Sequence, residues 1–292
     1  MSYVSLYVSL TKPRSVLLLL LTALVGSILA RREPPVTSVL LLTLIGGALA
    51  AAGANALNCY FDRDLDRLMV RTARRPLPTG AISPAHALTF GILLCSGSFA
   101  IFGLGVNWLS AALAFAGVVY YVLIYTLWLK RATPLNVVIG GGAGAIPLLV
   151  GWAAAAGQIT PPALLLAAAV FLWTPPHTWA LALLRKEDYT RTGIPMLPVV
   201  SGEEAASRQI LICSTLLVIT TLLLIPAGLV SAGFLPFSLI LGSYLIYLSA
   251  NLWRQGSSQA ARRLYRYSTL YLALLFGSMA LGRLVALASG RG

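Results

Sequence analysis

Apolar runs long enough to cross a membrane recur along the whole chain of 292 residues. A helix needs about 20 predominantly apolar residues to span a bilayer core of about 30 Å. Only 10% of the residues are charged, whereas an ordinary soluble domain has about 25%. We therefore predict an all-α polytopic membrane protein and exclude a large water-soluble enzyme, a disordered chain and a single hairpin anchor. The nine predicted spans are 15–30, 36–57, 84–104, 107–128, 134–152, 161–184, 209–230, 234–252 and 267–288.

The basic residues fall on one side of the predicted spans. Seventeen of the 21 Lys and Arg residues lie in the N-terminal segment and in the connectors after the second, fourth, sixth and eighth spans. By the positive-inside rule, the N-terminus and these connectors are cytoplasmic. Topology thus explains the formal net charge of +13, and we expect no nucleic-acid partner. We predict a single domain, 1–292, of nine transmembrane helices, with active-site loops 58–83 and 185–208 on the cytoplasmic side.

The first apolar run follows Lys12 and Arg14, and it therefore looks like a secretory signal peptide. The run also fits as the first member of a regular series of spans, which is the interpretation that we adopt. It has no Arg-rich and Ser-rich extension of the kind that organelle import uses. We therefore expect a bacterial protein of the cytoplasmic (inner) membrane that crosses the lipid bilayer many times.

Three polar side chains form a stripe where the second span ends. Asn58, Asp62 and Asp66 stand at i, i+4 and i+8, so they share one face if the helix continues. Neighbouring carboxylates on one face repel each other, and a divalent cation removes that cost. Mg²⁺ prefers oxygen ligands and is usually held by one or two carboxylates together with substrate phosphates. The stripe therefore predicts a magnesium site in which Asn58, Asp62 and Asp66 are the ligands and are catalytic.

Arginines follow the stripe at near-helical spacing. Guanidinium groups bind phosphate oxygens bidentately. We therefore predict that Arg67, Arg71 and Arg75 bind a diphosphate. The alternative interpretation is an interfacial helix whose Arg–Asp pairs are solvated on its loop face. We adopt that alternative for Arg63 and Asp64, which lie off the stripe.

The stripe and the basic segment after it resemble the first aspartate-rich motif of the UbiA superfamily of intramembrane prenyltransferases. Nine spans with an N-terminus inside also match the fold of that superfamily. The resemblance implies that the Asn and Asp side chains of the motif hold Mg²⁺ on an isoprenyl diphosphate. It also implies that the isoprenyl tail lies among apolar helices, where water is excluded and an allylic cation survives.

A second stretch, 173–200, resembles the members of the superfamily that farnesylate heme. Its Pro-Pro-His, Lys-x-Asp-Tyr and Gly-Ile-Pro-Met-Leu-Pro blocks carry this resemblance, and segments 71–78 and 125–142 agree with it. The resemblance implies transfer of a farnesyl group from farnesyl diphosphate to a vinyl group of heme b (protoheme IX). Addition of water would complete the reaction and give heme O and diphosphate. A heme A synthase or an oxidase-assembly factor is then a candidate protein partner.

The second loop departs from the wider superfamily in its acidic residues. Many members carry another Asp-x-x-x-Asp motif here, whereas Asp188 is followed at i+4 by Thr192. A second metal held by two aligned carboxylates is therefore not indicated, and one metal at the first motif is at least as plausible. We predict that Asp188 is catalytic and that Lys186 and Arg191 neutralise substrate phosphate from this side.

Four further side chains are candidates for the same chamber. Tyr125, Lys130 and Asn136 lie near the cytoplasmic ends of the fourth and fifth spans, and we predict that they bind substrate. A lone His in a membrane helix is unusual, and His177 follows a proline pair that frees backbone carbonyls. It can be interpreted as a contact of heme iron, as a base, or as a structural residue bonded to a freed carbonyl. The resemblance favours a functional role, and we count His177 as catalytic.

Three competing functions are weighed against this one. Prenyl transfer to another acceptor, such as 4-hydroxybenzoate, would use the same fold, but the blocks of the second loop argue against it. A secondary transporter places polar residues at mid-membrane, whereas the middles of these spans are nearly free of ionisable groups. A heme-holding assembly factor without catalysis would not need the diphosphate stripe. The sequence thus favours a prenyltransferase.

Overall fold

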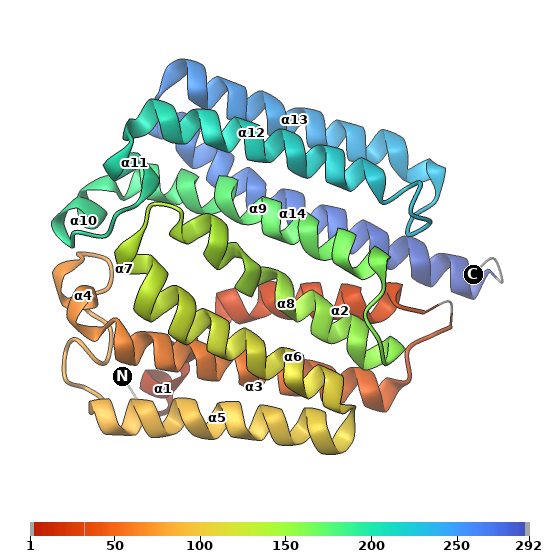
Figure 1. The fold of residues 1–292 in the computed structure, drawn as a ribbon, viewed down its shortest axis with the longest axis horizontal. Helices are drawn as coiled ribbons and strands as arrows, with labels where there is room; N and C mark the ends of the chain where they lie inside the picture. Colours follow the sequence, from red (N-terminus) through yellow and green to blue (C-terminus); the bar gives the residue numbers. More distant parts are fainter. Residues whose placement is uncertain (1–2, 32, 290–292) are drawn as a thin grey trace.

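The protein is a bundle of long helices that run roughly alongside one another (Figure 1). The computed structural model describes residues 3–31 and 33–289, and it contains no β-strand within those ranges. The expectation of an all-α polytopic membrane fold is confirmed. The long helices are α2 (Pro13–Leu29), α3 (Thr37–Phe61), α5 (Pro84–Gly105), α6 (Trp108–Val119), α8 (Asn136–Ala156), α9 (Pro161–Leu184), α12 (Gly202–Leu223), α13 (Leu235–Gln255) and α14 (Ser258–Ala288).

The number of spans agrees with the sequence. Eight helical segments of the described chain are long and apolar enough to cross a membrane. A ninth span results if α1 (Tyr3–Thr11) and α2, which are bent by 48° at their junction, are counted together. One of the eight spans, Trp108–Ala132, is composite. In it, α6 continues into the π-helical segment η1 (Tyr120–Leu129) and the short helix α7 (Lys130–Ala132).

Short helices gather at the end of the bundle where α3 ends, on the left in Figure 1. We call this the acidic end, because every described Asp and Glu except Glu33 belongs to it. Helix α1 also lies there and packs beside α3. The C-terminal end of α14 lies at the opposite end of the bundle. The other short helices are α4 (Arg63–Leu68), α10 (Lys186–Arg191) and α11 (Leu197–Val200), and the 3₁₀ turn η2 (Ala232–Phe234) precedes α13.

Helix ends deviate from the predicted spans where hydropathy alone is a poor guide. Helix α12 begins at Gly202 rather than at residue 209. It ends at Leu223 rather than at residue 230, because Pro226, which has no backbone N–H, lies in the turn that follows. Helix α14 begins at Ser258, well before the predicted 267, because arginines are good helix formers outside the bilayer. Helix α1 was not predicted at all. Its nine residues are too few to give a span signal.

A left-handed residue joins α1 to α2. Lys12 has φ 52°, and it is the one non-glycine residue in the described ranges with a positive φ. Pro13, the first residue of α2, fixes its own φ and supports the start of the new helix. Leu10 of α1 is buried against Cys59 and Leu77. The junction is therefore held against the end of α3, which places the Lys12 side chain there.

The centre of the bundle depends on a close approach between α2 and α8. A side chain at Gly151 would collide with the backbone carbonyl of Ala23, and one at Gly26 would collide with the carbonyl of Leu148. The hydroxyl of Ser27 donates to the Gly151 carbonyl at 3.0 Å. Small residues let helix backbones approach in this way within membranes. The approach fixes α8, which forms one wall of the site.

The variant Gly151→Ala tests the importance of this approach. Its methyl group has only backbone atoms to meet, so α2 and α8 must separate. We expect the free energy of unfolding to fall by about 1–3 kcal/mol, the usual cost of overpacking. Thermal unfolding of the purified protein in detergent, followed by size-exclusion chromatography, measures the change. The matched control is Gly277→Ala in α14, where the added methyl group would meet nothing within 4 Å. Equal melting temperatures for the two variants would contradict the assignment.

Candidate active site

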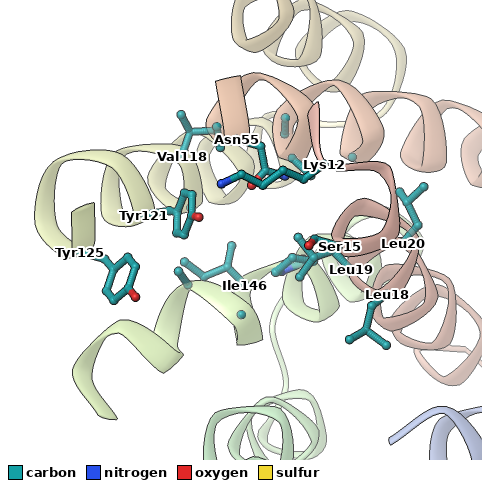
Figure 2. A pocket seen from close by; sticks show the side chains of 18 of the residues that line it. Lys12, Ser15, Leu18, Leu19, Leu20, Asn55, Val118, Tyr121, Tyr125 and Ile146 are labelled. Carbon is teal, nitrogen blue, oxygen red and sulfur yellow. The ribbon is translucent and has the colours of Figure 1, made fainter. Parts of the chain in front are cut away.

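A cavity of about 480 Å³ lies between α2, α3, α6, η1, α8 and α9. Most of its wall is apolar, formed by leucines of α2 and by small residues of α3 and α8. Polar and charged side chains lie at its acidic end, where Lys12, Arg71, Arg75 and Tyr125 line it. In Figure 2 the Lys12 side chain extends toward the wall that carries Val118 and Tyr121. The cavity therefore suits an amphiphile with an apolar tail and an anionic head.

The first part of the predicted stripe is hydrogen-bonded together at this end. Nδ2 of Asn58 donates to Oδ2 of Asp62 at 2.8 Å and to the Thr126 hydroxyl at 3.0 Å. The Lys130 ammonium group contacts the same Asp62 oxygen at 2.5 Å. Lys12 donates to Oδ1 of Asn58 at 2.6 Å. The N-terminal segment, α3 and η1–α7 thus meet on a single pair of side chains.

Asp66 continues the stripe across a break in the helix. Helix α3 ends at Phe61, and Asp62 separates it from α4. The backbone N–H of Asp66 still donates to the Asp62 carbonyl at 2.8 Å, so the helical spacing survives the break. The Asp66 carboxylate pairs with Arg75 at 2.7 Å, and its backbone carbonyl accepts from the Thr72 hydroxyl at 3.0 Å. Arg75, which the sequence predicted as a diphosphate ligand, therefore lies beside the stripe.

The burial of these carboxylates makes their environment unusual. The exposed fraction of Asp62 is 2% and that of Asp66 is 4%. A buried charge is costly unless it is paired, and here Lys130 and Arg75 provide the pairing. One atom is left over, because Oδ1 of Asp62 is buried without a hydrogen-bond partner among the described residues. An unpaired carboxylate oxygen of this kind is a natural ligand for a hard cation.

The described residues limit what kind of metal site this can be. They contain no group of three or more His, Cys, Asp or Glu side chains placed to hold a metal ion. An ion that needs a complete protein cage would therefore find no site here. Mg²⁺ fits better, because it keeps several waters and commonly shares one or two carboxylates with substrate phosphates. Asp62, Asp66 and the amide oxygen of Asn58 supply that kind of partial ligand set.

A π-helical segment shapes one wall of the cavity. Such segments are rare and often occur at functional sites. In η1 the rings of Tyr121 and Tyr125 stack with centroids 5.7 Å apart, and both rings line the cavity. The Tyr125 ring lies against the backbone of Gly140 in α8, where any larger residue would collide with it. Gly140 thus lets Tyr125 lie at the mouth, as the sequence predicted for Tyr125.

The second loop lies at the same end of the bundle but contributes less to the cavity. Lys186 pairs with Glu203 at 2.8 Å on the exposed surface, and Arg191 is exposed. The carboxylate of Asp188 is half-buried and takes part in none of the ion pairs found among the described residues. Burial raises the pKa of the Tyr189 hydroxyl, and the positive charge of Arg71 partly opposes this rise. Tyr189 therefore connects α10 electrostatically to the basic segment after the stripe.

Asn136 is fully buried at the start of α8. Its Nδ2 donates to the Thr133 carbonyl at 2.6 Å and to the Pro195 carbonyl of the second loop at 3.5 Å. Its Oδ1 has no partner among the residues that the structure describes. Asn136 thus joins the second loop to α8, next to the cavity-lining Val137.

His177 is not among the residues of α9 that line the cavity, although its neighbour Trp173 is. Its ring is stacked between Trp173 and Tyr265, with centroid distances of 4.5 and 4.7 Å. Its Nδ1 lies 2.9 Å from the Ser268 hydroxyl of α14. Trp173, which does line the cavity, donates to the Ser268 carbonyl at 2.7 Å. His177 therefore reaches the cavity only indirectly, through the ring of Trp173.

The predicted site residues thus fall into two groups. The first group lies at the acidic end of the cavity: Arg71, Arg75 and Tyr125 line it there, and Asn58, Asp62, Asp66 and Lys130 are not lining residues but are joined to the lining residues Lys12 and Arg75 by hydrogen bonds and ion pairs. Arg67 is exposed on α4, and Lys186, Arg191 and His177 are absent from the cavity lining. The sequence reasoning missed Lys12, Thr126 and Tyr121. Lys12 was used only to orient the chain, although its position directly before the first span was a signal for the cytoplasmic surface.

These features define a class of protein. A membrane-embedded helical bundle encloses an apolar cavity that ends at converging cations, next to two buried carboxylates, and this arrangement suits an enzyme for an anionic, apolar-tailed substrate. Comparison with known sequences gives the family, because residues 19–282 match the UbiA prenyltransferase family. The chain belongs to this family and is a multi-pass membrane prenyltransferase.

Several relatives in this family carry one name. The chain is 49% identical over 277 residues to "Protoheme IX farnesyltransferase" of Symbiobacterium thermophilum, covering 94% of this chain and 93% of that one. It is 46% identical to the protein of that name from Thermosynechococcus vestitus, covering 96% and 89%. It is also 49% identical to the one from Roseiflexus castenholzii, covering 96% of this chain. The chain spans only about half the length, 52%, of that relative.

Solved structures support the fold independently of sequence. A structure of digeranylgeranylglyceryl phosphate synthase has a TM-score of 0.80 at 19% identity, covering 98% of this chain and 100% of that one. A UbiA homolog from Archaeoglobus fulgidus, bound to DMAPP and Mg²⁺, has a TM-score of 0.73 at 20% identity. That match covers 94% of this chain and 99% of the homolog. At these identities the likeness establishes the fold.

The variant Gly140→Ala tests the placement of Tyr125. Its methyl group would collide with the Tyr125 ring and push the ring from the mouth of the cavity. A displacement of about 1 Å at an active site can cost about a hundredfold in rate, and we expect at least a tenfold loss of prenyl transfer by a protein that remains folded. Turnover of radiolabelled prenyl diphosphate in membranes measures the loss. The control is Gly142→Ala, whose methyl group would approach only the Tyr120 side chain, with the hydroxyl nearest at 3.3 Å. Full activity of Gly140→Ala would show that this contact is unimportant.

Proposed function

We propose that the protein transfers a farnesyl group from farnesyl diphosphate to a vinyl group of heme b, with addition of water, giving heme O and diphosphate. The observation that carries the proposal is the cavity itself, an apolar chamber lined at its acidic end by Lys12, Arg71 and Arg75, next to the two buried carboxylates. The names of relatives at 46–49% identity supply the acceptor and the length of the prenyl group.

The diphosphate head would be bound at the mouth of the cavity. Arg71 and Arg75 line the mouth, and their guanidinium groups can bind phosphate oxygens bidentately. The ammonium groups of Lys12 and Lys130 lie beside the same carboxylate–amide pair and add positive charge. Charge that gathers on the leaving diphosphate would thus be stabilised by groups that are already in place. From the second loop, Lys186, Arg191 and Asp188 would have to move inward to take part.

The stripe would hold Mg²⁺. Asp62 offers its unpaired Oδ1, and Asp66 and the Asn58 amide offer further oxygens. When bound, Mg²⁺ would supply charge that stabilises the leaving diphosphate. Lys130 and Arg75 would share the carboxylates with the ion. The negative charges of Asp62 and Asp66 would therefore be paired both with and without bound Mg²⁺.

The transfer step uses the water-free interior. Cleavage of the C1–O bond leaves the bonding electrons on diphosphate and a cation on the farnesyl chain, which the apolar wall protects from water. The vinyl group of heme b gives its π electrons to C1, and the positive charge moves to the carbon next to the porphyrin. Water adds to that carbon and loses a proton to solvent, which leaves a hydroxyl group on the product.

The porphyrin itself would lie at the open side of the cavity. A volume of about 480 Å³ is within the range of pockets for one small ligand, so the farnesyl tail would leave little room for a second large molecule. Basic residues at the same end could meet the heme propionates, and Lys130, Arg131 and Arg185 are candidates. We further propose that this end faces the cytoplasm of a bacterium, since the basic connectors lie there.

Asp62→Asn tests the proposal. The substitution removes the charge that Lys130 pairs with and replaces one of the two carboxylate oxygens by an amide nitrogen, which cannot bind a cation. We expect formation of heme O to fall about a hundredfold or more, with little change in the amount of folded protein. The measurement is pigment extraction and mass spectrometry of membranes incubated with farnesyl diphosphate, heme b and Mg²⁺. The control is Asp64→Asn, because Asp64 is exposed and lies off the stripe.

Two outcomes would count against the proposal. Near-normal heme O formation by Asp62→Asn would contradict the proposal that the stripe binds Mg²⁺ and that the diphosphate binds beside it. Prenylation of 4-hydroxybenzoate, with heme b left unmodified by the wild-type protein, would replace the acceptor while keeping the fold and the diphosphate site.

His177→Phe separates two roles for the histidine. Phenylalanine keeps an aromatic ring between Trp173 and Tyr265 but loses the bond to Ser268. Because the His177 ring does not line the cavity but stacks on Trp173, which does, we propose that it positions Trp173, and we expect less than about a tenfold loss of heme O formation. His177→Ala, which removes the ring, should cost more. A loss in His177→Phe as large as in Asp62→Asn would instead indicate direct contact with the reacting heme.

A further inference from the structure

The cavity ends deep in the bundle on the ring of a phenylalanine. Phe102 of α5 lines the cavity and is 0% exposed. It packs in one cluster with Ala111, Ala114 and Val150, from α6 and α8. This cluster lies far from the acidic end along each of the helices, and it forms the floor of the cavity.

The position of the Phe102 ring is tightly fixed. A side chain at Gly46 of α3 would come within 2.8 Å of the ring, so the ring lies directly on the α3 backbone. One turn earlier in α5, the Ser98 hydroxyl donates to the Gly46 carbonyl at 2.7 Å. These two contacts hold α5 against α3 at the level of the floor. The ring is therefore a rigid boundary rather than a movable side chain.

The distance from the mouth to the floor matches one particular chain length. Gly46 and Asn58 lie on the same helix, and at a rise of about 1.5 Å per residue their levels differ by about 18 Å. An extended carbon chain advances about 1.2 Å per bond, as a polypeptide backbone does over its three bonds. The tail of a farnesyl group, with three isoprene units, is on this basis about 14 Å long. A geranylgeranyl group needs about 5 Å more and would reach the ring.

We propose that Phe102 sets the length of the isoprenoid that the protein accepts, as the floor of the tail-binding cavity. This inference rests on the proposed function, because it takes a prenyl diphosphate as the substrate. The walls above the floor support it, since Gly47, Ala50, Ala51 and Ala54 of α3 line the cavity with minimal side chains. An extended tail can therefore pass along α3 without obstruction until it meets Phe102.

The substitution Phe102→Ala should lengthen the cavity by one isoprene unit. It removes a ring of six carbons, and an isoprene unit has five. We expect the ratio of kcat/KM for geranylgeranyl diphosphate over farnesyl diphosphate to rise at least about tenfold, within the range typical of apolar pockets. The matched control is Phe99→Ala, one turn earlier in α5. Phe99 is 39% exposed, packs on Trp108 and Phe115, and is absent from the cavity lining.

A second variant tests the same idea in the opposite direction. Ala51 lines the cavity between the mouth and the floor, and Ala51→Leu adds three carbons to the wall there. We expect this variant to favour geranyl diphosphate over farnesyl diphosphate by at least about tenfold relative to the wild type. Because it leaves Phe102 in place, it remains informative if Phe102→Ala does not fold. Phe102→Leu, a smaller truncation, should show an intermediate shift.

Binding measured without an acceptor separates this inference from the proposed function. Each purified variant is heated with geranyl, farnesyl or geranylgeranyl diphosphate, and the rise in Tm ranks the ligands. If the ranking shifts as expected while heme b is never prenylated, the length inference stands and the acceptor is wrong. If heme b is farnesylated but folded Phe102 and Ala51 variants keep the wild-type ranking within twofold in affinity, the inference is overturned.

Discussion

The burial of two carboxylates at one end of a membrane bundle is the constraint on which the site depends. Asp62 and Asp66 are almost fully buried, so each needs a paired cation. Their partners are Lys130, at the end of the Trp108–Ala132 span, and Arg75, in the loop before α5. Lys12 joins through Asn58 from the other end of the sequence. The electrostatic cost of two buried acids thus brings together segments that are far apart in the chain, and two of the residues that meet there, Lys12 and Arg75, line the cavity.

The same pairing leaves a charge imbalance that suits the proposed substrate. Two carboxylates face three nearby cations, Lys12, Lys130 and Arg75, so the cluster carries a net positive charge. A prenyl diphosphate that arrives with one Mg²⁺ has a small net negative charge and would neutralise the cluster. Free Mg²⁺ alone would add to the positive charge, which disfavours its binding. On the proposed function, metal and diphosphate would therefore bind best together, and without substrate the carboxylates would stay paired with Lys130 and Arg75.

Some parts of this arrangement were predictable and others were not. The spans follow from hydropathy, and the contact between Asn58 and Asp62 follows from the helical repeat. Lys12 was missed because its position depends on a left-handed residue and on the packing of a short helix, neither of which gives a hydropathy signal. The contact of His177 with α14 was equally hidden, because the hydropathy of an apolar span does not reveal which neighbouring helix each of its residues faces. Hydropathy thus predicts how deep a residue lies in the membrane, and only the packing of the helices determines which neighbour its side chain faces.

In helix α3, small residues have different effects on the two faces of the helix. Small residues in a membrane helix suggest close helix packing, and α3 has many of them between Gly46 and Ala54. Gly46 and Gly53 do meet α5, where any side chain would collide with Phe102 or with Cys95. Gly47 and Ala50, on another face, line the cavity. The small residues of α3 thus have two effects. On one face they let a neighbouring helix approach, and on the other they leave space for a ligand.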